Sequence, residues 1–349
     1  MQNIQKRLLL LLSIFIISIG INTSCTADLA QGEGDYSRIR SISRPYTFDF
    51  VSWEAQAISS LLCERICNRG GSEHESRLRS QIESVLAENR IPLFPPLNFN
   101  LEEPPHLLVI SPRDRIFYLD KILLRQELSA QEMEQLEAQV DKLGLSSLVV
   151  SLGGFGATYP PIVDGNGSLD FVINAAVEEW LHQYLAFRPL GFLYLLDSLG
   201  IKQDQDVIIM NETLAGMVSE EIGSQVYERY YAASEKAVAD ERNSSFDFDT
   251  EMRLTRRNVD LYLAQGDIEG TERYMEERRQ LFWSHGYRIR KLNQAYFAFH
   301  GIYGSDPASV SPIDADMKFL RAESPSIKDF LDKTSGMKSY TDLVKALQK

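Results

Sequence analysis

The segment at residues 171–187 constrains the fold most, because it has a helical apolar pattern that no proline or glycine interrupts. Its apolar residues at helical spacing are Val172, Ala176, Trp180, Leu181, Tyr184 and Leu185. Pro189 follows shortly after the segment and favours the end of the helix there. Positions four apart share one helical face, so Glu178 and His182 point the same way, and Glu179 lies about 100° around the axis.

A second helix is predicted over residues 210–222, with Asn211 as its N-cap and Glu212 in its first turn. Its apolar stripe consists of Leu214, Met217, Val218 and Ile222. Residues 190–199, between the two helices, are strongly hydrophobic but too few to span a bilayer. We therefore expect them to form a core helix that connects the other two.

The two helices carry the sequences EEWLH and NETLA, which together resemble the HExxH…NExxA pattern of gluzincin-type zinc metallopeptidases. In this family two histidines on one helix and a glutamate on a later helix bind zinc, and the glutamate after the first histidine is the general base. The resemblance covers roughly residues 147–223. Carried over by position, it implies a zincin-like fold in which Glu179 is the general base and His182 and Glu212 are zinc ligands.

Glu178 stands where the family has its first histidine. A carboxylate can also bind metal, so the expected ligand set is Glu178, His182 and Glu212. The added negative charge makes bound water less acidic and favours harder metals than zinc. The expected cofactor is Zn²⁺, with another divalent metal, or no metal in a degenerate site, as alternatives. A solvated helix face that binds nothing is the remaining interpretation.

Two buried strands are predicted upstream, at residues 106–111 (HLLVIS) and 147–152 (SLVVSL). A helix lies between them as a crossover; it begins with a capping box at residues 129–132 and ends near Gly144. The next segment, GGFGA at residues 153–157, lacks the lysine and hydroxyl residue of a phosphate loop. It is either a turn or, as the resemblance implies, an edge strand that pairs with an extended peptide. The predicted fold is α+β and mostly helical, with a small zincin-like sheet, an active-site-type helix and a helical C-terminal part.

The N-terminal residues 1–27 are typical of a targeting segment, because Lys6 and Arg7 precede a run of fourteen uncharged residues. The segment is expected to be a cleaved signal peptide, a lipoprotein segment ending at Cys25, or an uncleaved membrane anchor. Residues 28–47 are polar and are expected to form a tether. Each alternative exports the chain and places it in a bacterial cell envelope, with membrane contact through the N-terminal segment.

Residues 48–235 are expected to form the zincin-like part, and residues 236–349 the helical C-terminal part. Helices are predicted in the latter at residues 251–264, 267–285 and 287–300, before short amphipathic pieces. Tyr296 and His300 share a face of the third helix. Either side chain could stabilise the oxyanion of peptide hydrolysis, so both are candidate catalytic residues beside Glu179. A satisfied core face is the alternative.

Composition limits the classes of partner. The net charge of −13 argues against nucleic acid, whose phosphates require a basic surface, and against docking on anionic lipid. Cys63 and Cys67 are four apart on a predicted helix and form either a disulfide in a distorted turn or two free thiols. The expected function is an exported metallopeptidase that acts on a peptide or protein substrate. The alternative is a non-catalytic envelope protein that keeps the fold for binding or structure.

Overall fold

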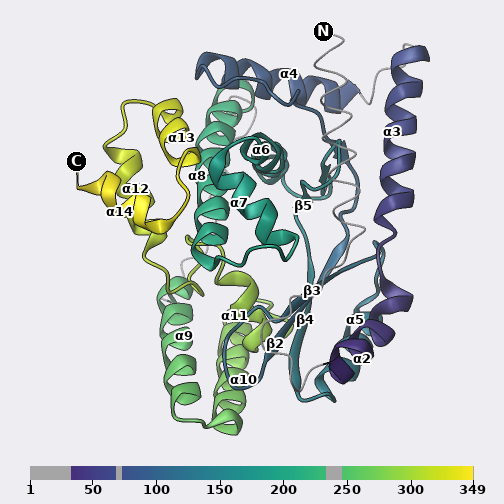
Figure 1. Ribbon diagram of the computed structural model, residues 1–349, viewed down its shortest axis with the longest axis vertical. Helices are drawn as coiled ribbons and strands as arrows, with labels where there is room; N and C mark the ends of the chain where they lie inside the picture. The colour runs from purple at the N-terminus through teal and green to yellow at the C-terminus, as the bar shows by residue number, and fades with distance from the viewer. Residues whose placement is uncertain (1–32, 68–72, 233–245, 349) are drawn as a thin grey trace.

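The computed structural model describes residues 33–67, 73–232 and 246–348 (Figure 1). The chain is α+β and mostly helical, as the sequence predicts, with two small three-stranded sheets among the helices. The expected targeting segment, residues 1–27 with Cys25, lies outside the described residues. None of the helices that the structure describes is long and apolar enough to cross a membrane.

The main sheet has β2 (His106–Pro112) at its centre, between β3 (Asp120–Leu124) and β4 (Leu145–Ser151). Both neighbours run antiparallel to β2. The sequence prediction missed β3, so the helix does not cross over between β2 and β4 as expected. It connects β3 to β4, which run parallel to each other on either side of β2. The intervening helix, α5 (Ala130–Asp141), packs against β4, and its predicted capping box is confirmed.

The segment before the sheet is folded and is not the expected tether. Residues 33–43 form α2 (Glu33–Ser43), which continues into the short 3-10 helix η1 (Arg44–Tyr46). Ile39 is buried in the apolar cluster between α5 and the main sheet. The carbonyl of Tyr46 accepts a hydrogen bond from the backbone N–H of Arg125 (2.7 Å). One buried isoleucine and backbone bonding to the sheet outweigh the polar composition that predicted a tether.

The helix predicted to carry Cys63 and Cys67 is confirmed as α3 (Phe50–Cys67), although the side chains of these two cysteines lie outside the described part of the chain. The disulfide and free-thiol interpretations of this pair both stay predictions. The helix lies along one side of the molecule (Figure 1). Near its start, Phe48 and Phe50 pack edge-on against Phe155, which places the helix beside the segment with the glycines.

A second, smaller sheet lies between the main sheet and the long helices. It consists of β1 (Asn100–Leu101), β6 (Ile162–Val163) and β5 (Gly154–Phe155), in that spatial order. β1 pairs in parallel with β6, whereas β5 pairs with it antiparallel. The segment predicted as either a turn or an edge strand therefore contains the short edge strand β5.

The largest core forms where α6 (Leu169–Ala186) packs on α8 (Gln205–Tyr230), with α7 (Pro189–Ser198) connecting them. α4 (Glu73–Glu88) closes one side of this core. Trp180 is fully buried there, and its indole N–H donates to the carbonyl of Pro95 (2.9 Å). The apolar periodicity of the sequence predicted α6 and α8, and the hydrophobic run between them predicted α7.

The start of α8 differs from the prediction. Its N-cap is Asp204, whose carboxylate accepts a hydrogen bond from the backbone N–H of Val207. The prediction of Asn211 as the N-cap is wrong, because Asn211 is fully buried inside the helix. Its polar side chain contacts a neighbouring helix and does not cap the backbone of α8.

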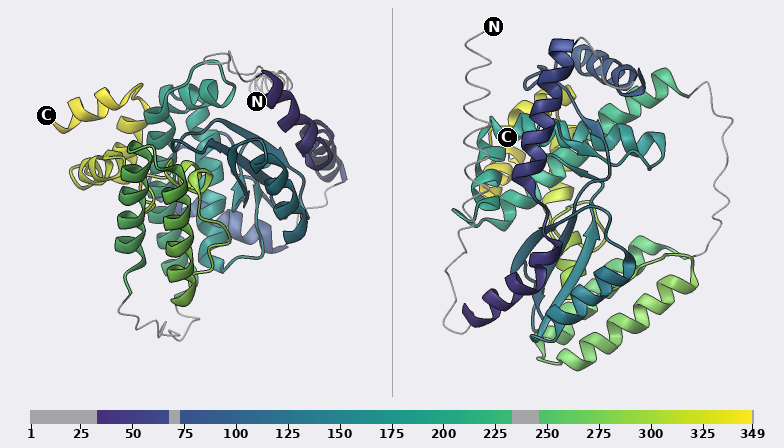
Figure 2. Two further views of the ribbon diagram at one scale, coloured as in Figure 1. Left: turned by 90° about the horizontal axis from the view of Figure 1, so that it is seen from below. Right: turned by 90° about the vertical axis from the view of Figure 1, so that its right-hand side faces the viewer.

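The C-terminal part begins with an antiparallel pair, α9 (Phe248–Ala264) and α10 (Ile268–Ser284). Figure 2 shows this pair and α2 on opposite sides of the main sheet. α11 (Gln294–His300) packs on the face of β2 and β4. The predicted helix over residues 287–300 is therefore wrong in its first half, because α11 starts at the Asn293 N-cap. The chain ends in α12 (Ile313–Ala322), α13 (Ile327–Ser335) and α14 (Tyr340–Leu347), all packed against α8.

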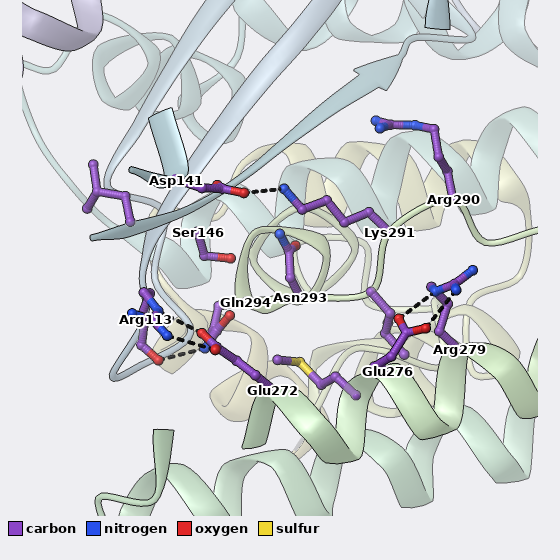
Figure 3. A pocket seen from close by; sticks show the side chains of 13 residues that line it. Arg113, Asp141, Ser146, Glu272, Glu276, Arg279, Arg290, Lys291, Asn293 and Gln294 are labelled. Atoms are coloured by element: carbon purple, nitrogen blue, oxygen red, sulfur yellow. Dashed lines mark hydrogen bonds and ion pairs between the residues drawn. The ribbon is translucent and has the colours of Figure 1, made fainter. Parts of the chain in front are cut away.

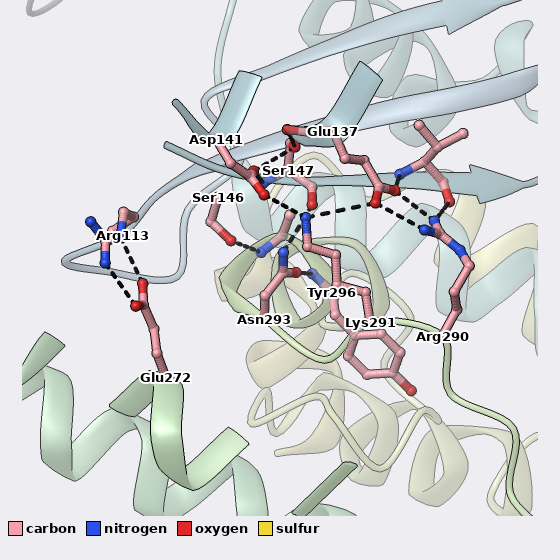
Figure 4. A network of polar contacts seen from close by, with 12 residues as sticks. Arg113, Glu137, Asp141, Ser146, Ser147, Glu272, Arg290, Lys291, Asn293 and Tyr296 are labelled. Carbon is pink, nitrogen blue, oxygen red and sulfur yellow. Dashed lines mark hydrogen bonds and ion pairs between the residues drawn. The ribbon is translucent and has the colours of Figure 1, made fainter. Parts of the chain in front are cut away.

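Side chains cap the outer edge of β4 (Figure 4). The four bonds are Ser147 N–H to Asp141 Oδ1 (3.0 Å), Val149 N–H to Glu137 Oε1 (2.6 Å), Asn293 Nδ2 to Ser147 O (2.9 Å) and Arg290 Nη2 to Val149 O (2.9 Å). The two acceptors come from α5, and the two donors come from the segment before α11. This arrangement prevents another strand from pairing with this part of the edge.

Candidate metal centre

The packing of α6 on α8 brings the three predicted ligands together. Glu178 and His182 lie one turn apart at the margin of the buried face of α6, and Glu212 faces them from α8. One ligand atom from each residue can be chosen so that all three lie within 4.8 Å of one another. His182 Nε2 is 3.6 Å from Glu212 Oε2. The expected convergence of these three side chains is confirmed.

This donor set fits a divalent cation. Carboxylate and imidazole groups are ligands for zinc and for harder ions such as manganese. A tetrahedral ion with bonds of about 2.1 Å holds its ligand atoms roughly 3.4 Å apart, which is near the separation of His182 Nε2 and Glu212 Oε2. Burial raises the pKa of Glu178; the nearby His182 opposes this rise and the charge of Glu212 adds to it. A bound cation would offset the electrostatic repulsion between the two carboxylates.

Asn211 orients the imidazole of His182. Its Nδ2 lies 3.2 Å from His182 Nδ1, and its buried Oδ1 has no hydrogen-bond partner in the described residues. Rotating the amide by 180° presents Oδ1 to a protonated Nδ1, satisfies the unpaired oxygen and leaves the lone pair of Nε2 for a metal. A carbonyl acceptor behind a histidine ligand is the usual arrangement in metal sites. The unpaired oxygen is therefore consistent with metal binding through Nε2.

Tyr194, on α7, supports two ligands at once. Its hydroxyl donates to Glu212 Oε1 (2.7 Å), and its ring stacks on the imidazole of His182 with centroids 5.7 Å apart. The pKa of Tyr194 is raised well above its usual value, chiefly by burial and then by the charge of Glu212, so the hydroxyl keeps its proton and remains a donor. The hydrophobic connecting helix thus supplies a side chain that holds the ligands in place.

Glu179 lies against the glycine segment. A Cβ added to Gly154 would be 2.3 Å from Glu179 Oε1, and one added to Gly156 would be 2.6 Å from Oε2, so only glycine fits at these positions without displacing the carboxylate. The pKa of Glu179 is raised well above its usual value, first by burial and then by Glu178 and Glu212. The backbone N–H of Gly156 donates to the carboxylate and opposes this rise.

The predicted oxyanion donors Tyr296 and His300 lie beside each other on α11, with ring centroids 4.1 Å apart. His300 Nδ1 is 2.9 Å from Asp306 Oδ2. The structure shows no contact between either side chain and the ligand residues within the described chain. Tyr303, just after α11, does interact electrostatically with the ligand residues. Burial raises its pKa, and the charges of Glu212 and Glu178 raise it further.

A fourth tyrosine and the glycine loop complete the surroundings. Tyr118, from the β2–β3 connection, also has a pKa that burial and Glu212 raise. Gln183 Nε2 donates to the carbonyls of Gly156 (3.2 Å) and Thr158 (2.6 Å), which ties the loop after β5 to α6. Sequence reasoning missed Tyr118, Tyr194 and Tyr303, because each lies on a different element and no local spacing links it to the ligands.

Comparison with known proteins adds no relative. No protein-family model, no curated protein and no solved structure matches this chain. The gluzincin resemblance thus rests on the two motifs, and what the structure adds is a group of one histidine and two glutamates that could hold a metal ion.

Proposed function

We propose that this protein is a metal-dependent peptidase that hydrolyses peptide bonds at the Glu178–His182–Glu212 centre. The convergence of these three side chains within 4.8 Å, next to the half-buried Glu179, is the observation that carries the proposal. Zn²⁺ is the first candidate cofactor, and the two carboxylates also suit a harder ion such as Mn²⁺. The proposal includes export to the cell envelope, which rests on residues 1–27 alone.

Each residue has a defined task in this proposal. A bound divalent cation supplies Lewis-acid polarisation of the scissile carbonyl and lowers the pKa of water. Glu179 accepts the proton of the attacking water and passes it to the leaving amine. Asn211 and Tyr194 hold His182 and Glu212 in position.

Binding of the substrate and of the developing oxyanion falls to groups around Glu179. β5 offers a backbone edge beside this carboxylate, and the absence of side chains at Gly154 and Gly156 lets a peptide backbone approach. Tyr303 keeps its phenolic proton, because burial and the charges of Glu212 and Glu178 raise its pKa, and it is our proposed donor for the oxyanion in preference to Tyr296.

The test combines metal content with hydrolysis of a mixture of unstructured peptides by the purified chain. After dialysis the wild type should retain one equivalent of metal and cleave peptides, and Glu212→Gln should lose both properties. Glu179→Gln should keep the metal and lose hydrolysis. Glu220→Gln, an exposed glutamate on the same helix as Glu212, is the matched control and should behave as the wild type.

This experiment also distinguishes the peptidase from a metal-dependent binding protein and from a degenerate fold without metal. Stoichiometric metal without hydrolysis under any condition would reject the peptidase and favour a metal-dependent binding protein of the envelope. Absence of metal, with Glu212→Gln indistinguishable from the wild type, would reject the metal centre altogether and favour a degenerate fold that keeps a binding or structural role.

A further inference from the structure

Tyr303 lies on a tight turn between α11 and α12, and this turn is braced from within. The N–H of Tyr303 donates to the carbonyl of His300 (3.2 Å), and the carbonyl of Tyr303 accepts a bond from the N–H of Asp306 (3.0 Å). The side chains of His300 and Asp306 close the turn, with His300 Nδ1 2.9 Å from Asp306 Oδ2. The backbone of Tyr303 is therefore held on both sides within the turn.

The helix that precedes the turn is fixed to the main sheet at its start. Gln294 Nε2 donates to the carbonyl of Arg113, just after β2 (2.6 Å). This bond lies beside a cavity of about 550 Å³ between α10 and the main sheet (Figure 3). In the walls of the cavity Arg113 is paired with Glu272, and Lys291 with Asp141. The sheet therefore sets the position of the start of α11, whereas the turn after α11 needs another anchor.

The turn has this anchor on α8, at the residue that follows the predicted ligand Glu212. The N–H of Gly304 donates to Thr213 Oγ1 (3.2 Å). A Cβ added to Gly304 would be 2.5 Å from this oxygen and 3.2 Å from the Cβ of Asp314, so no side chain fits at this position without displacing a neighbour. The backbone of the turn therefore contacts α8 directly at Thr213.

The hydroxyl of Thr213 differs from those of other buried helical threonines. Thr255, Thr271 and Thr334 each donate to the carbonyl four residues earlier, which is a common bond for this side chain in a helix. Thr213 is only 3% exposed, yet among the described residues no hydrogen bond joins its hydroxyl to a carbonyl of α8. Its oxygen accepts a bond from the turn instead.

Two adjacent pairs of residues meet at this contact: Glu212 and Thr213 on α8, and Tyr303 and Gly304 on the turn. Thr213 and Gly304 are hydrogen-bonded, and Glu212 and Tyr303 interact electrostatically. Burial raises the pKa of Tyr303, and the charges of Glu212, Glu178 and Glu179 raise it further. Since α8 is a long helix and the turn is braced, the Thr213–Gly304 bond sets the position of the phenol relative to the carboxylate of Glu212.

We propose that Thr213 is a positioning residue, which holds the phenol of Tyr303 at the candidate metal centre through its bond to Gly304. This inference rests on the proposed peptidase function and deepens it, because it specifies how the proposed oxyanion donor keeps its place. Thr213 itself contacts neither metal nor substrate. Loss of the bond would misalign the phenol with the developing oxyanion, so the effect falls on the chemical step and not on binding of substrate or metal.

Thr213→Val is the first test, because valine has nearly the shape of threonine and lacks the acceptor. Its kcat on unstructured peptides should fall about tenfold, while KM and metal content stay within about twofold of the wild type. Thr213→Ser keeps the hydroxyl and should restore most of the kcat. Gly304→Ala forces the turn away from Thr213 and should reproduce the loss. Thr341→Val, at an exposed threonine on α14, is the matched control and should behave as the wild type.

A double-mutant comparison shows whether Thr213 acts through the phenol. Tyr303→Phe should lower kcat, and adding Thr213→Val in this background should cause no further loss. A further tenfold loss in that background would overturn the inference. An unchanged kcat in Tyr303→Phe, an unchanged kcat in both Thr213→Val and Gly304→Ala, or loss of metal from Thr213→Val would each overturn it as well.

A spectroscopic measurement tests the placement of the phenol without turnover. Tyrosine labelled with ¹³C at its ζ carbon is incorporated into the chain, and the Tyr303 signal is identified by its absence from Tyr303→Phe. In the metal-free protein Thr213→Val should shift this signal, whereas Thr213→Ser and Thr341→Val should not. A signal that Thr213→Val leaves in place would overturn the inference, even in an active peptidase. The expected shifts in a protein that cleaves nothing would support the placement by Thr213 and reject the peptidase.

Discussion

Glu54 on α3 provides a test of the structure that does not depend on its function. Its side chain is 2% exposed, and its carboxylate oxygens accept a hydrogen bond from the backbone N–H of Tyr159 (3.3 and 3.4 Å). Burial raises the pKa of Glu54 from 4.5 to about 7, and the bond from Tyr159 only partly opposes this rise. The residue links α3 to the loop that follows β5. We predict that Glu54→Gln stabilises the protein, and does so more at high pH.

The sign and the size follow from proton linkage. The folded protein binds the proton of Glu54 more tightly than the unfolded chain does, so stability is fully present below pH 4.5 and falls as the pH rises to about 7. At 1.36 kcal/mol per pH unit, the loss at alkaline pH is about 3 kcal/mol. Glutamine stays neutral and still accepts the bond from Tyr159. The gain in the free energy of unfolding should therefore grow by about 2 kcal/mol between pH 5.5 and pH 8.5.

Urea unfolding, followed by circular dichroism at these two pH values, measures the effect. Glu269→Gln, an exposed glutamate on α10, controls for the removal of one negative charge from an acidic protein. A gain for Glu54→Gln that is the same at both pH values, or no larger than that of the control, would refute the argument that Glu54 is buried and holds its proton near neutral pH.

The metal centre supports three further predictions. Tyr194→Phe removes the hydroxyl that bonds to Glu212, so metal affinity measured by calorimetry should fall by about tenfold or more; an unchanged affinity would contradict this supporting role. Glu178→His supplies the imidazole that zinc prefers, so zinc affinity in a chelator competition should rise, and a decrease would count against the resemblance. Gly154→Ala places a Cβ 2.3 Å from Glu179 Oε1 and moves the carboxylate by about 1 Å; metal should be retained while kcat falls by about 100-fold, and activity within threefold of the wild type would exclude Glu179 as the base.

The ligand residues could be predicted because their arrangement depends on local geometry. Spacing on one helix places Glu178 and His182 on the same face, and the apolar pattern of the two long helices favours packing that brings Glu212 opposite them. The supporting tyrosines could not be predicted, because their positions depend on tertiary packing. Tyr194 and Tyr303 come from different elements and reach Glu212 only in the folded chain.

The errors in the predicted fold have the same origin. α2 looks polar in sequence, and the burial of Ile39 by the distant α5 cannot be deduced from local pattern. β3 is short and partly exposed, so its sequence lacks a strong period-two pattern. Its conformation is set by pairing with β2. Asn211 is a residue type that commonly caps helices, but here it is buried and its side chain contacts His182. In each case a long-range contact overrides a local propensity.

The caps on β4 form at different times during synthesis. The N–H groups of Ser147 and Val149 find their acceptors within 12 positions of the chain, at Asp141 and Glu137. The carbonyls of Ser147 and Val149 can be capped only after Asn293 and Arg290 have been synthesised, 146 and 141 positions later. At about 5–20 residues per second, ribosomal elongation leaves this half of the edge open for roughly 7–30 s. An unfinished chain that stops before Arg290 therefore presents a half-open strand that can recruit other nascent copies, and only completion of the C-terminal part closes it.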